Sequence, residues 1–278
     1  AKADFYVAPN GQDSNPGTSD APFATLERAR NAVREKVSAG LNQDVLVLIH
    51  GGIYSQTETL SFGSADSCTE DHSITYAAAP GEQVVLSGGR RLAGWQKGSG
   101  EIWTTEIPEV KAGKWYFRQL FVNGVRATRA RTPNAGAHDS WWKIVSSTAS
   151  QDKPPAENDS ITIKVSGKVA AWSNPSDIEL VYMQNNESGQ KRLGSIDEKA
   201  QTFTLAPPHR WNPKVFLDDW PLSMPFAGKP CYLENALEML DQPGEWYLDR
   251  HTGILHYWPR PGEDLTQAEV IAPVIQNT

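Results

Sequence analysis

Beyond residue 40, the apolar residues of this chain come in runs of strand length, separated by Gly, Pro, Asn, Asp and Ser. Such runs are typical of β-strands joined by turns. The run VLVLI at 45–49 is apolar at every position, and Gly51 and Gly52 follow it closely. A continuous apolar run of this length is expected for a strand that is buried on both faces. The sequence therefore predicts a mainly β protein.

One amphipathic helix is expected near the N-terminus, over about residues 25–39. Thr25 can cap its start, Gly40 can end it, and one face carries Leu26, Ala29, Val33 and Val37. Short strands are predicted after it at TLSF (59–62), SITYAA (73–78) and QVVLSG (83–88). We expect these strands to form the first coils of a parallel β-helix, with the helix covering the open first coil. A β-sandwich fits the same pattern.

From about residue 115 the pattern indicates antiparallel strands. Asn123-Gly124 between apolar flanks predicts a hairpin, and GEWYLDRHTGILHYWP at 244–259 predicts another around Arg250 to Gly253. We therefore expect an N-terminal cap with the first coils over 1–114, an inserted antiparallel β-sandwich over 115–268, and a return strand over 269–278.

Composition and motifs exclude several classes of protein. The 278 residues carry a formal net charge of −7 with scattered basic residues, which disfavours a nucleic-acid-binding role. No run approaches the ~18 apolar residues of a membrane span. Zinc spacings, serine-hydrolase elbows and nucleotide-binding loops are all missing from the sequence. Cys68 and Cys231 could form one disulfide or remain two free thiols.

Several segments resemble a known family. FYVAPNGQDSNPGTSDAPFATLERARNAV, VLVLIHGGIY and ITYAAAPGEQVVLSGG resemble the N-terminal region of secreted right-handed parallel β-helix proteins that act on polysaccharides, including xylosidase-like glycoside hydrolases. FRQLFVNGVRATRARTPN and ALEMLDQPGEWYLDRHTGILHYWPRPGED resemble the β-sandwich inserted in many of these proteins. The resemblance implies a bacterial protein that is secreted, periplasmic or on the cell surface.

The resemblance also implies a function. It points to a glycoside hydrolase that cleaves plant, algal or host polysaccharide with carboxylate acid/base chemistry and no organic cofactor. In the xylosidase relatives the catalytic carboxylates lie in later coils, which would place them beyond Thr278, in a C-terminal remainder of the protein or a second polypeptide. A polysaccharide lyase and a non-catalytic carbohydrate-binding or structural module are the alternatives. The sugar, the linkage, the stereochemical outcome and the oligomeric state stay open.

Two carboxylates are candidates for catalysis, Glu234 and Asp219. Glycoside cleavage needs a facing pair of carboxyl groups, about 5 to 5.5 Å apart for retention or about 6.5 to 9.5 Å for inversion. Glu234 and Asn235 stand among apolar residues, where a carboxylate needs partners. Arg126, Arg129 and Arg131 could supply them. Such a group could be a salt bridge between sheets or a binding site for an acidic sugar.

Aromatic and oxygen-rich segments supply the other candidates. Sugar rings stack on aromatic faces, and four tryptophans lie in expected loops: Trp141, Trp142, Trp211 and Trp220. The segment QDSNPGTSD at 12–20 offers oxygen ligands for calcium, but turn formation explains its composition more simply. We therefore expect an oligo- or polysaccharide as the partner and no metal, with calcium as the alternative.

Overall fold

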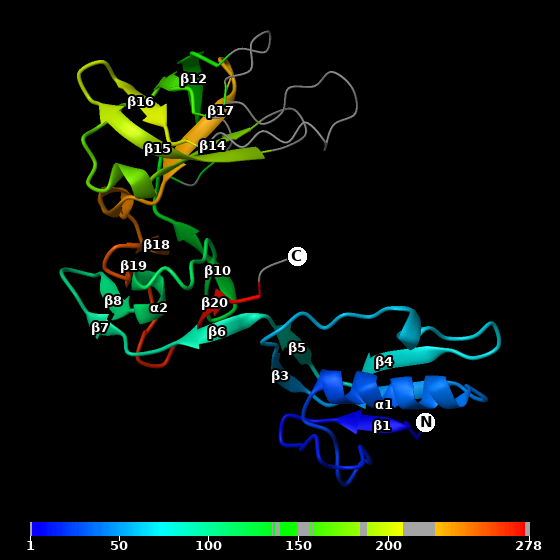
Figure 1. Cartoon of the computed structure of the whole chain (residues 1–278). Helices are drawn as coiled ribbons and strands as arrows, with labels where there is room; N and C mark the ends of the chain where they lie inside the picture. The colour runs from blue at the N-terminus through cyan, green and yellow to red at the C-terminus, as the bar shows by residue number, and fades with distance from the viewer. Residues whose placement is uncertain are drawn as a thin grey trace. The chain divides into compact units, whose positions relative to one another are not determined.

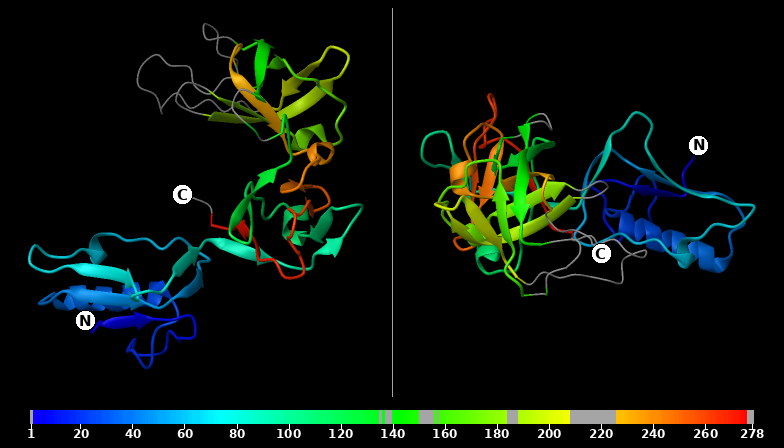
Figure 2. Two further views of the ribbon diagram at one scale, coloured as in Figure 1. Left: turned by 180° about the vertical axis from the view of Figure 1, so that it is seen from behind. Right: turned by 90° about the horizontal axis from the view of Figure 1, so that it is seen from above.

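The computed structural model describes residues 2–134, 136, 140–149, 156, 158–183, 188–207 and 226–275. The chain divides into two compact units, which Figures 1 and 2 show from three sides. The first unit comprises Ala1–Arg90 with Pro273–Thr278, and the second comprises Arg91–Ala272.

In the first unit, one helix packs on a small parallel sheet. The sheet has the strand order β1-β2-β4, and a separate parallel pair joins β3 and β5. Buried side chains of the helix and of β2 form one apolar cluster that includes Phe23, Val33 and Val47. The elements are β1 (Phe5–Val7), α1 (Leu26–Ala39), β2 (Val45–Ile49), β3 (Gly52–Ser55), the 3-10 helix η1 (Ser64–Asp66), β4 (Ile74–Ala78) and β5 (Val84–Ser87).

The predicted helix is confirmed, and Thr25 caps its N-terminus. Thr25 Oγ1 accepts a hydrogen bond from the Arg28 N–H at 3.1 Å, and Gly40 ends the helix with φ 95°. Asp13 in turn accepts bonds of 2.9 Å from the N–H groups of Ala24 and Thr25. The Asp13 carboxylate therefore fixes the segment that leads into the helix, as expected for a turn-forming sequence.

The second unit contains nearly all of the antiparallel structure. Its strands form two sheets. The strands are β6 (Gly89–Leu92), β7 (Gln96–Lys97), β8 (Trp103–Glu106), β9 (Leu120–Val122), β10 (Val125–Arg129), β11 (Arg131–Thr132), β12 (Trp142–Ser147), β13 (Thr162–Val165), β14 (Glu179–Met183), β15 (Ser188–Asp197), β16 (Thr202–Leu205), β17 (Pro230–Glu234), β18 (Glu245–Leu248), β19 (Ile254–Tyr257) and β20 (Val270–Pro273). The short helices between them are α2 (Pro108–Lys111), η3 (Pro175–Asp177) and η5 (Leu237–Met239). Of the strands, β6 and β20 cross the boundaries between the two units along the chain.

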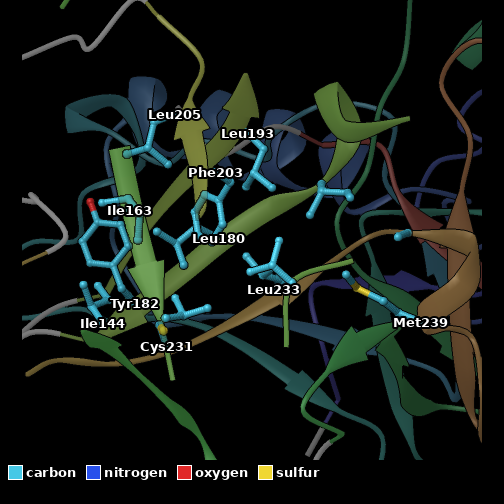
Figure 3. Close-up of a cluster of buried hydrophobic side chains, with 14 of the residues drawn as sticks. Ile144, Ile163, Leu180, Tyr182, Leu193, Phe203, Leu205, Cys231, Leu233 and Met239 are labelled. Atoms are coloured by element: carbon cyan, nitrogen blue, oxygen red, sulfur yellow. The ribbon is translucent and has the colours of Figure 1, made fainter. Parts of the chain in front are cut away.

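One of these sheets is a closed six-stranded antiparallel barrel. Its strands follow the order β17-β12-β13-β16-β15-β14, and β14 pairs with β17 to complete the circle, with β11 added at the edge. Figure 3 shows the core, where Ile163, Leu180, Leu193 and Phe203 point toward one another from different strands. These four side chains are at most 1% exposed, so the barrel interior is a packed core.

The other sheet is a half-barrel with the strand order β6-β20-β9-β10-β18-β19-β8-β7. It contains both predicted hairpins, which are confirmed: Asn123 and Gly124 have φ values of 50° and 76° between β9 and β10, and β18 pairs with β19. On β18, Trp246 belongs to the core of the half-barrel, whereas Tyr247 belongs to the core of the barrel. This strand therefore packs against both cores.

The predicted right-handed parallel β-helix with an inserted antiparallel β-sandwich is wrong. Stacked coils are not found among the described residues, where the strands β1-β2-β4, β3-β5 and β10-β18 pair in parallel without forming successive coils. In β2, Val45, Val47 and Ile49 are buried while the leucines between them are partly exposed. The apolar run thus fits a helix-covered sheet as well as a coil. Likewise, alternating strands bury one face in a barrel just as they do in a sandwich, so the pattern could not distinguish them.

Over the described residues, the structure has no helix with the length and apolar character needed to cross a membrane.

Candidate functional site

The candidate site is built around Arg129, the last residue of β10, which is only 5% exposed. Arg129 Nη1 donates to Glu179 Oε2 at 2.7 Å and to Glu234 Oε1 at 2.8 Å. Its Nε donates to Asn235 Oδ1 at 3.2 Å, and its Nη2 donates to the Tyr116 hydroxyl. We call these five residues the Arg129 network. Every nitrogen of this buried guanidinium therefore has a partner.

The fold brings this network together from both sheets of the second unit. Glu179 on β14 and Glu234 on β17 are direct neighbours in the pairing that closes the barrel. Arg129 comes from the half-barrel sheet, where it pairs with Trp246 of β18. Asn235 follows β17 with φ 69°, and its N–H donates to the carbonyl of Ala130 at 2.8 Å. The network therefore joins the barrel to the half-barrel.

The two carboxylates of the network differ in their electrostatic surroundings. Burial raises the pKa of Glu234 above its ordinary value, although Arg129 opposes this effect. Burial alone would also raise the pKa of Glu179, but Arg129 and Arg118 outweigh it and hold this pKa below its ordinary value. Arg118 binds Glu179 directly, because its Nη2 donates to Glu179 Oε1 at 2.8 Å. Glu179 is therefore a fixed anion of the network.

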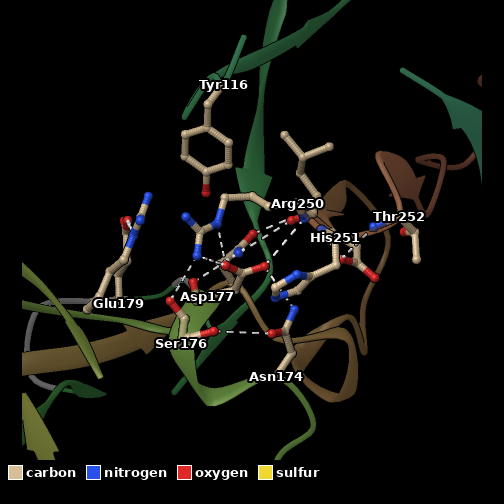
Figure 4. Close-up of polar contacts among 12 residues, drawn as sticks. Tyr116, Asn174, Ser176, Asp177, Glu179, Arg250, His251 and Thr252 are labelled. Atoms are coloured by element: carbon tan, nitrogen blue, oxygen red, sulfur yellow. Dashed lines mark hydrogen bonds and ion pairs between the residues drawn. The ribbon is translucent and has the colours of Figure 1, made fainter. Parts of the chain in front are cut away.

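A second polar cluster stands next to the Arg129 network and is shown in Figure 4. The buried Asp177 carboxylate pairs with the guanidinium of Arg250 and accepts a hydrogen bond from Asn174 Nδ2 at 2.8 Å. Asn235 Nδ2 donates to the Asp177 carbonyl at 3.0 Å, which connects the two clusters. The Arg250 guanidinium also lies over the ring of Tyr116 at 5.8 Å. These contacts hold η3 and the 245–257 hairpin together.

A cavity of about 330 Å³ opens beside Arg129. Arginines dominate its wall, and Glu234 is the one carboxylate among its described lining residues. The described residues that line it are Arg118, Arg126, Ala127, Thr128, Arg129, Arg131, Tyr232 and Glu234.

Arg131 occupies a distinctive position on this wall. Its guanidinium carbon lies 4.7 Å above the Tyr232 ring, and its buried Nε makes no hydrogen bond within the part of the chain that the structure describes. Cation–aromatic stacking of this kind holds the side chain in place without neutralising its charge.

The structure brings together five residues that the sequence singled out, namely Glu234, Asn235, Arg126, Arg129 and Arg131. Glu234, Asn235 and Arg129 belong to the network. All of the five except Asn235 line the cavity among the described residues.

The structure describes two of the four tryptophan candidates, Trp141 and Trp142. Trp141 lies edge-on to Tyr232, with ring centroids 5.4 Å apart, and is thus close to the cavity wall. Trp142 packs against the barrel core and lies so close to Gly167 that no side chain could be added there. The other three candidates, Asp219, Trp211 and Trp220, lie outside the described residues.

Sequence reasoning missed Glu179, Tyr116 and Asp177. Glu179 stands in the strand sequence DIELVYM with apolar neighbours on both sides, and it is fully buried. That context is the same signal that singled out Glu234, so the rule that a carboxylate in an apolar run needs a partner would have found it. Tyr116 carries no comparable signal, because its role depends on the approach of Arg129.

Other titratable groups lie away from the cavity. Cys68 is exposed and Cys231 is buried, and both are free thiols. Burial raises the pKa of Cys231 to about 12. Among the residues that the structure places, no three His, Cys, Asp or Glu side chains gather closely enough to hold a metal ion.

Comparison with solved structures relates this chain to a glycoside hydrolase. A solved structure described as "Glycoside hydrolase" matches 99% of this chain with a TM-score of 0.77 and 29% identity, and this chain covers 46% of it. A second structure, "The complex structure of XylC with xylose", matches 97% of this chain at 17% identity and a TM-score of 0.38, with 31% of that chain covered. This second likeness is too low to carry an argument.

Sequence comparison adds one relative and one family. The uncharacterized protein YwoF of Bacillus subtilis (strain 168) is 39% identical over 84 residues, which is 30% of this chain and 15% of that protein. The chain thus spans less than half of the solved glycoside hydrolase and a smaller share of YwoF. The family described as the GH141 insertion domain matches residues 100–260, which include the barrel and Arg129 with its partners. The chain therefore belongs to the GH141 insertion domain family and is a carbohydrate-active, glycoside hydrolase-related protein.

Proposed function

We propose that this chain is part of a glycoside hydrolase that cleaves plant, algal or host polysaccharide by carboxylate acid/base chemistry. Within that protein, its own role is to bind carbohydrate, while the reacting carboxylates are supplied by other parts of the protein. The likeness to the solved glycoside hydrolase supports the first statement, and the wall of the cavity supports the second. Because polysaccharides of these kinds occur outside cells, the proposal includes export to the periplasm, the cell surface or the medium.

The observation that carries this proposal is that Glu234 is the one carboxylate among the described residues that line the cavity. A glycosidase needs two carboxyl groups that face each other across the scissile bond. Glu179 is the strand neighbour of Glu234, but it is fully buried and is bound by Arg118 and Arg129. A carboxylate with its oxygens occupied by guanidinium groups is a poor nucleophile or base. We therefore infer a structural role, and not a catalytic one, for the pair Glu179 and Glu234.

The test is to assay the 278-residue chain against a panel of plant, algal and host polysaccharides and aryl glycosides. We expect binding to at least one glycan, measured by affinity electrophoresis, without release of reducing ends. Release of reducing ends by this chain, lost in Glu234→Gln and kept in Glu101→Gln, would contradict the proposal. Products with an unsaturated, ultraviolet-absorbing end would instead identify a lyase.

A further inference from the structure

We propose that the cavity beside Arg129 binds the carboxylate of a uronic acid residue in an oligosaccharide. This inference rests on the proposed function, because it names the class of carbohydrate that the chain binds. The described lining residues all belong to the second unit and come from β10, β11, β17 and the segment before β9.

The charge of the wall is the first argument. Four arginines and one glutamate line the cavity. Arg118 and Arg129 share the carboxylate of Glu179, which also lies 3.5 Å from the Nε of Arg192. The wall therefore carries more positive than negative charge even after its ion pairs are counted. Clefts with one sign of charge attract ligands of the opposite sign.

The second argument is that two of the four arginines have no acidic partner. Arg126 is exposed, and neither Arg126 nor Arg131 makes an ion pair with a carboxylate among the residues that the structure describes. The buried Nε–H of Arg131 also has no hydrogen-bond acceptor among the residues placed in the structure. A buried donor without an acceptor is costly, and a ligand oxygen would remove that cost. This N–H group is therefore available to a bound ligand.

The third argument concerns the shape of the anion. A guanidinium group binds a planar carboxylate through two parallel N–H···O bonds, and Arg131 is held against Tyr232 in a fixed orientation. The cavity volume of about 330 Å³ is near the lower end of the range of ligand pockets, about 300 to 1,000 Å³. This volume suits a terminal or branching sugar residue. Thr128 and Glu234 can accept hydrogen bonds from the hydroxyl groups of that sugar.

The test measures binding of uronate oligosaccharides to the 278-residue chain by isothermal titration calorimetry. The ligands are oligogalacturonides, alginate oligosaccharides and glucuronate-branched xylo-oligosaccharides, each compared with its carboxyl-reduced, neutral form. A set of sulfated oligosaccharides distinguishes sulfate esters from carboxylates. We expect at least one uronate series to bind, its reduced form to bind about tenfold or more weakly, and added salt to weaken the binding.

Matched variants locate the site. Arg126→Gln and Arg131→Gln should each weaken uronate binding about tenfold, since each removes a charge-assisted contact. Arg131→Lys keeps the charge but loses the planar fork, and we expect it to restore only part of the affinity. Arg91→Gln is the control, because Arg91 is exposed in the same unit, lies outside the cavity wall and carries the same charge. It should bind like the parent chain.

The outcomes separate this inference from the proposed function. Equal binding of uronate and reduced ligands, or unchanged binding by both Gln variants, would overturn the inference while glycan binding still supported the proposed function. A preference for sulfated ligands would overturn the assignment to uronates. If no glycan of any kind binds, both fail. Should Arg131→Gln prove unfolded by circular dichroism, the exposed Arg126→Gln decides the question alone.

Discussion

Replacing Glu245 with Gln should stabilise this protein at neutral and alkaline pH. Glu245 is the first residue of β18 and is fully buried. Its carboxylate accepts bonds from the N–H of Asp241 at 3.2 Å and from the side chain of Gln242 at 3.4 Å, and no cation pairs with it among the described residues. Burial raises the pKa of Glu245 from 4.5 to about 7. The folded chain therefore buries a carboxyl group that favours its neutral form.

The size of the expected change in the free energy of unfolding follows from this difference in pKa. Each pKa unit corresponds to about 1.4 kcal/mol, so the rise from 4.5 to about 7 gives an upper bound of about 3 kcal/mol. Because the folded state holds the proton more tightly than the unfolded state, the free energy of unfolding is unaffected below pH 4.5 and falls as the pH rises toward 7. The Gln side chain resembles the protonated carboxyl group in shape and does not titrate. We expect a pH-dependent gain of about 1 to 3 kcal/mol.

The assay is urea unfolding, monitored by tryptophan fluorescence, of the parent chain and of Glu245→Gln at about pH 5 and about pH 8. The control is Glu101→Gln, which changes an exposed carboxylate in the same unit. Burial also lowers the pKa of His256, which favours folding as the pH rises, but this contribution is shared by all three proteins and cancels in the differences. A stability difference between Glu245→Gln and the parent that is the same at both pH values would refute the reasoning.

Three further predictions concern other parts of the structure. Arg129→Met leaves two buried carboxylates without their shared cation and should lower the free energy of unfolding by about 3 to 5 kcal/mol in urea titrations. Gly253→Ala should cost more than Gly113→Ala, by about 1 to 2 kcal/mol in the same assay, because both glycines have positive φ but a Cβ on Gly253 would lie 2.7 Å from a backbone oxygen; equal costs would contradict this. Cys68 should react with a thiol reagent in the native protein, whereas Cys231, whose pKa burial raises to about 12, should react only after denaturation.

Short segments carried enough information in the sequence alone to be predicted. The helix at 26–39 was predictable because Thr25 as its cap, its apolar face and Gly40 as its end all lie within one local stretch. Asn123-Gly124 predicted its hairpin for the same reason, since both residues tolerate positive φ. The partnership of Glu234 with Arg129 was also foreseeable, because a carboxylate among apolar residues needs a counter-charge.

Tertiary structure alone decided which strands became neighbours. Alternating apolar residues specify a buried face, but they do not specify whether that face lines a sandwich, a barrel or a coil. The barrel closes because β14 pairs with β17, and this pairing joins segments that are separated by two other strands in the sequence. The same pairing places Glu179 beside Glu234 and leaves the arginines of β10 and β11 around one cavity. The sequence by itself therefore determined local structure and the need for ion pairs, whereas the cavity arose from long-range pairing that no local pattern encodes.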